Sequence, residues 1–190
     1  EVDKIKKRLA KEANMGIDTW EKKRKEAKGN KFEELKTVAY HKNSDSNLIV
    51  VRSSEYDDFI NGVDNVMVDK KSGKVVCAID EVVDDSGESN IYKNKVRNIS
   101  EKNKAGGATI KYCFTYKEGE DKPRLDTARN VPIFHLSLSR GDLQKEISKF
   151  EDGDQEKELF EKLNKQISSQ VRKGDFGSRV SEIDRDKWMV

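Results

Sequence analysis

Apolar positions recur along the chain with two periods, which predict a mixture of helices and strands. Helical spacing marks residues 2–12, short segments that begin at Asp18 and Asn30, residues 91–104, and two C-terminal segments that begin near residues 139 and 154. β-Branched or alternating runs mark strands at residues 47–52, 62–69, 75–84, 108–116 and 131–138. We therefore predict an α/β (α+β) fold. It has a mixed central sheet of about five strands, with an N-terminal helix, a crossover helix and C-terminal helices packed on its faces.

The stretch from Gly62 to Asp84 is the most informative, because it predicts a β-hairpin that carries acids at one end. Two β-branched runs flank a short turn at residues 71–73, where a glycine supplies the positive φ that a tight turn needs. Asp64 opens the first strand, whereas Asp80 and Glu81 lie near the end of the second. An antiparallel hairpin brings these two places together, so we expect the carboxylates to gather at one end of the sheet.

An acid inside an apolar β-run is costly unless a partner compensates its charge, and a divalent cation is a common partner. The alternative is that these acids are solvated caps at wet strand ends. Alternation along the strand sharpens the first interpretation. Asp80 and Glu81 face opposite sides of the sheet, so at most one of the two shares a face with the site unless a bulge intervenes.

Composition and charge change this picture only in part. Charged residues make up 39% of the 190 residues and apolar residues 34%, which indicates a modest core under a very polar surface. Residues 1–36 hold twelve Lys/Arg against eight Asp/Glu, residues 45–84 four against nine, and residues 91–117 seven against one. An acidic centre between basic helices is typical of a metal-dependent enzyme that acts on nucleic acid, although a Lys/Glu-rich surface gives the same distribution by chance.

A second basic feature lies near the N-terminus. Residues 22–28 contain five basic side chains beside Trp20 and could hold a phosphate backbone, or they could form an ordinary solvated helix face. The cysteines Cys77 and Cys113 both fall in predicted strands, as buried small apolar residues of a reducing compartment. With no apolar run long enough to span a membrane and no visible signal peptide, we expect a cytoplasmic protein.

The element order and the acids together resemble the PD-(D/E)xK nuclease family, which has the restriction-endonuclease-like fold. The resemblance covers residues 30–138, with a basic helical extension at residues 1–29 and a C-terminal helical part at residues 139–190. Gly62-Val63-Asp64 resembles the acid at the start of the family's second strand, and Ile79-Asp80-Glu81-Val82 resembles the acid-x-Lys at the end of its third. The resemblance implies that Asp64 and Asp80 bind Mg²⁺ or Mn²⁺, with Glu81 either as a third ligand or as the ligand in place of Asp80.

The family's motif lysine is absent, because valines occupy positions 82 and 83. Some members place that lysine on a neighbouring element, and here Lys93, Lys95 or Lys111 could take the role. Glu33 or Glu34 would resemble the additional acid that some members carry on the preceding helix.

Three functions remain open from the sequence. The first is a metal-dependent nuclease acting on DNA or RNA, in which a metal-bound water attacks the phosphodiester and a lysine stabilises the developing charge. The second is an inactive module of the same fold that binds nucleic acid or other proteins, which the two valines favour. The third is an unrelated α/β protein-binding domain whose acids are surface residues.

Overall fold

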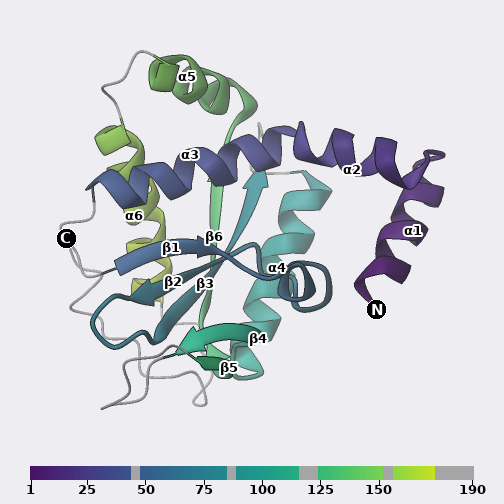
Figure 1. The fold of residues 1–190 in the computed structure, drawn as a ribbon. Helices are drawn as coiled ribbons and strands as arrows, with labels where there is room; N and C mark the ends of the chain where they lie inside the picture. The colour runs from purple at the N-terminus through teal and green to yellow at the C-terminus, as the bar shows by residue number, and fades with distance from the viewer. Residues whose placement is uncertain (44–47, 85–88, 116–123, 152–155, 174–190) are drawn as a thin grey trace.

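A computed structural model describes residues 1–43, 48–84, 89–115, 124–151 and 156–173 of the chain (Figure 1). Its helices are α1 (Val2–Glu12), α2 (Ile17–Lys25), α3 (Lys28–Asn43), the π-helical turn η1 (Asp57–Asn61), α4 (Asn90–Lys104), α5 (Arg140–Glu151) and α6 (Glu156–Lys173). Its strands are β1 (Leu48–Arg52), β2 (Asn65–Asp69), β3 (Val75–Val83), β4 (Ala108–Thr115), β5 (Arg124–Val131) and β6 (Ile133–Leu138). Among these helices, none is long and apolar enough to cross a membrane.

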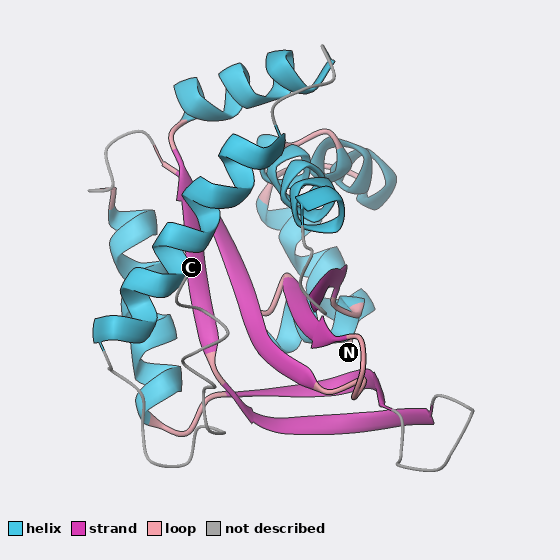
Figure 2. Cartoon of the chain, turned by 90° about the vertical axis from the view of Figure 1, so that its left-hand side faces the viewer, coloured by secondary structure: helices cyan, strands magenta, loops and turns pink. Residues whose placement is uncertain are grey.

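The main sheet is mixed, as predicted, and has the strand order β1-β2-β3-β6. β1, β2 and β3 form an antiparallel meander, and β6 pairs in parallel with β3. The parallel pair requires a crossover, which α4 and the hairpin β4–β5 supply. The predicted fold class is therefore confirmed, but β4 does not join the main sheet. It pairs instead with β5 in a separate two-stranded sheet, which Figure 2 shows at the bottom, across the direction of the main strands.

Both faces of the main sheet are covered, and each cover forms its own apolar core. On one face α3, α5 and α6 pack against β-strand side chains that include Met67, Ile79 and Phe134, all fully buried. On the other face α4 and the β4–β5 hairpin enclose a smaller core around Val66 and Ala78. This arrangement explains why β3 is apolar at nearly every position, because a strand buried on both faces does not alternate with polar residues.

Side-chain amides cover the outer edge of β6. Gln166 and Gln170, one turn apart on α6, bond both the N–H and the C=O of Ser137 and of His135, with donor–acceptor distances of 2.7–3.0 Å. Asn103 of α4 does the same for Ile133, at 2.8 and 2.9 Å. The backbone groups that an edge strand normally leaves unpaired are therefore satisfied by helices at three alternate residues.

Replacing the buried Asn103 tests this edge. Asn103→Ala is expected to lower the free energy of unfolding by about 2 to 4 kcal/mol, because it leaves two backbone groups of the buried Ile133 without partners. Urea denaturation followed by circular dichroism measures the change. The control is Asn98→Ala, at an exposed position of the same helix, where we expect a change within about 0.5 kcal/mol. Equal stability of the two variants would contradict the structural role of Asn103.

Some of the predicted turns and helix starts are confirmed and others are wrong. Gly73 has φ +64° in the hairpin turn, as expected, and α5 begins at Arg140, close to the predicted start near residue 139; the Ser139 hydroxyl caps it by accepting from the Asp142 N–H at 2.9 Å. The expected helix starts at Asp18 and Asn30 are wrong, since α2 begins at Ile17 and α3 at Lys28. The charged segment between the predicted strands at residues 108–116 and 131–138 contains β5, where the sequence analysis places no strand, while residues 116–123 lie outside the described part.

The alternation expected for β4 is also wrong beyond Ile110. Ile110 is buried, and Cys113 is buried as expected for both cysteines, but Tyr112, which alternation would place on the same side as Ile110, is 41% exposed. The cause is a shift in the register of β4 against β5 between Ile110 and Cys113, which changes the side of the strand on which the following residues point.

Candidate metal centre

The hairpin gathers acids at one end of the sheet, as its antiparallel pairing requires. Asn65, the first residue of β2, pairs with Ile79 in the middle of β3, just before Asp80 and Glu81. Asp64 directly precedes β2, so its carboxylate lies beside the second half of β3. It accepts a hydrogen bond from the Glu81 N–H at 3.1 Å. The structure therefore brings Asp64 beside Asp80 and Glu81 at one end of the sheet, as predicted.

Asp80 and Glu81 then separate onto opposite faces of β3. Glu81 faces α3, where its Oε1 accepts a hydrogen bond from the Asn65 amide at 3.1 Å and forms an ion pair with Lys36. Asp80 faces α4, where its Oδ1 lies 2.5 Å from the Lys95 Nζ. The two neighbouring acids thus have different lysines as partners, and Asp64 lies at the sheet end between them.

Glu33, Asp64 and Glu81 each offer an oxygen within 4.8 Å of those of the other two. Two oxygens on opposite sides of a Mg²⁺ ion lie about 4.2 Å apart, because each Mg–O bond is about 2.1 Å. Small side-chain movements would therefore let all three carboxylates share one ion. Of the two acids that the sequence left open on α3, the structure brings Glu33 to the site, whereas Glu34 is exposed and pairs with Lys31 at 3.1 Å.

Glu81 supplies a second and independent indication of a cation. Its side chain is 4% exposed, and Oε2 is buried without a hydrogen-bond partner among the described residues. A buried carboxylate oxygen without a donor is costly, since it has lost its hydration. A cation shared with Asp64 and Glu33 would coordinate this oxygen, to which no described residue donates a hydrogen bond.

Lys36 is fully buried on α3, and the sequence analysis did not identify it. Burial lowers its pKa to about 7, although the carboxylates of Asp64 and Glu33 oppose the shift. The sequence did contain a feature that predicts the burial of Lys36, which is its position on the apolar face of α3. Lys36 lies four residues after Phe32 and directly after Leu35, where the helical period predicts a side chain directed into the core.

On the α4 face, Lys95 connects the two halves of the hairpin. Besides Asp80, its Nζ lies 3.7 Å from Asp64 Oδ2 and donates a hydrogen bond to the Glu81 carbonyl. Burial and the neighbouring Asp64 raise the pKa of Asp80 to about 8, against the effect of Lys95. Burial works against the charge on Lys95, but Asp80 and Asp64 outweigh it and raise the pKa of the lysine.

The other predicted site residues lie elsewhere. Asp80 is beside the carboxylate cluster but is not one of its three members. Lys93 is exposed on α4. Lys111 lies over the rings of Tyr56 and Tyr112, at 4.2 and 5.4 Å from their centroids. Of the three lysines that could replace the missing motif lysine, the structure brings only Lys95 to the acids.

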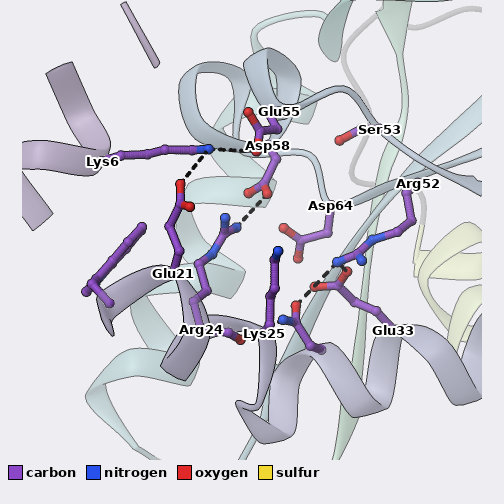
Figure 3. A pocket seen from close by; sticks show the side chains of 12 residues that line it. Lys6, Glu21, Arg24, Lys25, Glu33, Arg52, Ser53, Glu55, Asp58 and Asp64 are labelled. Atoms are coloured by element: carbon purple, nitrogen blue, oxygen red, sulfur yellow. Dashed lines mark hydrogen bonds and ion pairs between the residues drawn. The ribbon is translucent and has the colours of Figure 1, made fainter. Parts of the chain in front are cut away.

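Glu33 and Asp64 also line a pocket of about 300 Å³, shown in Figure 3. Its walls come from α1, α2, the start of α3, the end of β1 and the segment around η1. Arg52 lies at the same end as the acids and forms an ion pair with Glu33. Burial raises the pKa of Glu33, against the effect of this arginine. The carboxylates of Glu33 and Asp64 are therefore accessible from a defined pocket, whereas Glu81 lies behind them and is buried.

No protein-family model, curated protein or solved structure matches this chain.

Proposed function

We propose that the protein is a metal-dependent nuclease that hydrolyses phosphodiester bonds of DNA or RNA. One observation carries the proposal: three carboxylates, Glu33, Asp64 and Glu81, can reach one ion, and a buried oxygen of Glu81 accepts no hydrogen bond from the described residues. Hard oxygen ligands of this kind suit Mg²⁺ or Mn²⁺. The resemblance to PD-(D/E)xK nucleases, drawn from the motif residues and the element order, supports the same reaction.

Each residue has a distinct part in the proposed reaction. Asp64, Glu81 and Glu33 would hold the ion, which when bound polarises a water and offsets phosphate charge. Lys95 lies within reach of both Asp64 and the Glu81 backbone, so it can orient the attacking water and stabilise the charge that develops on the phosphate. Lys36 has no exposed surface and acts as a positioning residue, because it holds Glu81 by an ion pair.

Metal binding and cleavage test the proposal directly. We expect isothermal titration with Mg²⁺ and Mn²⁺ to give a saturable heat, and a mixture of single-stranded and double-stranded DNA and RNA to be cleaved only when one of these ions is present. Chelation by EDTA should stop the cleavage. Absence of both heat and cleavage would refute the nuclease function.

The second candidate is a module of the same fold that binds nucleic acid without cleaving it. A specific observation favours it, since Lys36 and Lys95 already neutralise Glu81 and Asp80 without a metal. Binding of nucleic acid that is unaffected by Mg²⁺ or EDTA, with no cleavage, would select this candidate.

Lys95 gives a variant that separates chemistry from metal binding. Lys95→Gln is expected to lower the cleavage rate by about 100-fold, because it removes a positive charge beside the reacting phosphate. Mg²⁺ affinity should stay within about threefold, since the three proposed ligands remain. Single-turnover cleavage and calorimetry measure the two effects. Lys93→Gln, at an exposed position two residues earlier, is the matched control and should cleave like the unaltered protein. Equal rates for both variants would contradict the proposed part of Lys95.

A further inference from the structure

The pocket beside the carboxylates has a rigid opposite wall. Arg24 of α2 bonds Asp58 Oδ2 at 2.6 Å and stacks over the ring of Phe59 at 4.2 Å from its centroid. Lys6 of α1 pairs with Glu55 at 2.7 Å. These contacts bind both N-terminal helices to the segment around η1. The first two helices therefore form a fixed side of the pocket, which faces Asp64 and Glu33.

Formal charges at this site nearly balance in the absence of a metal. Counted as ionised, the groups give a net charge of −1, since seven carboxylates meet six cations: Glu21, Glu33, Glu55, Asp58, Asp64, Asp80 and Glu81 against Lys6, Arg24, Lys25, Lys36, Arg52 and Lys95. A divalent ion adds two positive charges and leaves the site with a net positive charge, which favours an anion beside it. The pocket is where such an anion can enter.

Lys25 is the cation best placed to receive that anion. It lines the pocket, is exposed, and makes no ion pair within the described part of the chain. Figure 3 shows its side chain directed toward Asp64, between Arg24 and Arg52, both of which already have carboxylate partners. A phosphate between Lys25 and the carboxylate-bound ion would therefore pair with Lys25, which has no other ionic partner in the described part of the chain.

The dimensions of the pocket limit what can carry that phosphate. About 300 Å³ is at the lower end of the volumes that enclose small ligands, and it admits a group of the size of one nucleotide. An intact duplex is far wider, since its major groove alone measures about 12 Å. Trp20, on the same wall, adds an aromatic surface of the kind that unpaired bases contact in single-strand sites.

We infer that this pocket binds one nucleotide of single-stranded nucleic acid, with its phosphate between Lys25 and the carboxylate cluster and its base or sugar beside Trp20. The inference rests on the proposed nuclease function and specifies its substrate as a single strand.

Fluorescence anisotropy in Ca²⁺ tests the inference, with a labelled single-stranded oligothymidine and a blunt hairpin duplex of equal length as probes. We expect the single strand to bind at least tenfold more tightly than the duplex. Lys25→Glu should weaken single-strand binding at least tenfold, whereas Lys23→Glu, at an exposed position outside the pocket, should weaken it less than threefold. Equal affinity for the two probes, or equal losses in the two variants, would overturn the inference.

Tryptophan emission gives a readout at the pocket itself. Trp20 and Trp188 are the tryptophans of the chain, so Trp188→Phe leaves Trp20 as the reporter. Single-strand binding should change its emission, and an unchanged signal at saturation would count against the inference.

Cleavage assays separate a failure of this inference from a failure of the proposed function. Cleavage of a covalently closed duplex circle at the same rate as a single strand would refute the pocket assignment and support the nuclease. Single-strand binding that depends on Lys25, with no cleavage in Mg²⁺ or Mn²⁺, would support the pocket assignment and refute the nuclease.

Discussion

Asp64→Asn is expected to lower the rate of Mg²⁺-dependent cleavage by about 1000-fold, equivalent to about 4 kcal/mol of transition-state stabilisation. Asp64 is the acid that belongs to the three-carboxylate cluster and also contacts the α4 side through Lys95. Its loss removes one of the three proposed anionic ligands, so Mg²⁺ affinity should fall at least tenfold as well. Single-turnover cleavage and calorimetric titration measure the two effects.

The substitution is nearly isosteric, so the fold should survive it. The asparagine keeps a carbonyl oxygen that can accept the hydrogen bond from the Glu81 N–H. Glu34→Gln serves as the control, because it removes an exposed acid next to Glu33 and should leave both rate and affinity unchanged. A variant at Asp64 that retains more than a tenth of the original rate would show that the reaction centre lies elsewhere.

The second large effect is on stability. Lys36→Met should lower the free energy of unfolding by about 3 to 5 kcal/mol, since it leaves the buried carboxylate of Glu81 without its cation. Methionine has nearly the same length and keeps the apolar packing of α3, so the loss reports the charge and not a cavity. Urea denaturation followed by circular dichroism measures the change.

A double substitution distinguishes this explanation from a general loss of packing. Lys36→Met combined with Glu81→Leu should recover most of the lost stability, because neither charge then remains buried. Lys31→Met, at an exposed position of the same helix, should change stability by less than 1 kcal/mol. If the double variant is no more stable than Lys36→Met alone, the ion pair does not account for the loss.

The parts of the fold that depend on local sequence could be predicted. The β2–β3 hairpin follows from two β-branched runs and from Gly73, whose positive φ the turn requires. The separation of Asp80 and Glu81 onto opposite faces follows from the two-residue period of a strand. These two rules were enough to place the three hairpin acids at one end of the sheet.

The partners of those acids depended on packing between distant segments. Asp64 lies beside both Asp80 and Glu81. The position of α3, which presents Glu33 and Lys36 to the Glu81 face of β3, makes Glu81 the member of the three-carboxylate cluster. Lys95 is distinguished from Lys93 by the orientation of α4 against the sheet, and from Lys111 by the pairing of β4 with β5 outside the main sheet. The register shift in β4 likewise arises from its pairing with β5, a strand that the charged segment gave no reason to expect.

The amides along β6 also bear on how copies of the protein could associate. Addition of strands from molecule to molecule needs two free borders on each sheet, one to receive and one to extend. In the four-stranded sheet, Gln166, Gln170 and Asn103 occupy the β6 border, so only the β1 border remains for contact with another strand. Association of copies through the edge of this sheet would therefore end at a dimer and could not propagate into a fibre.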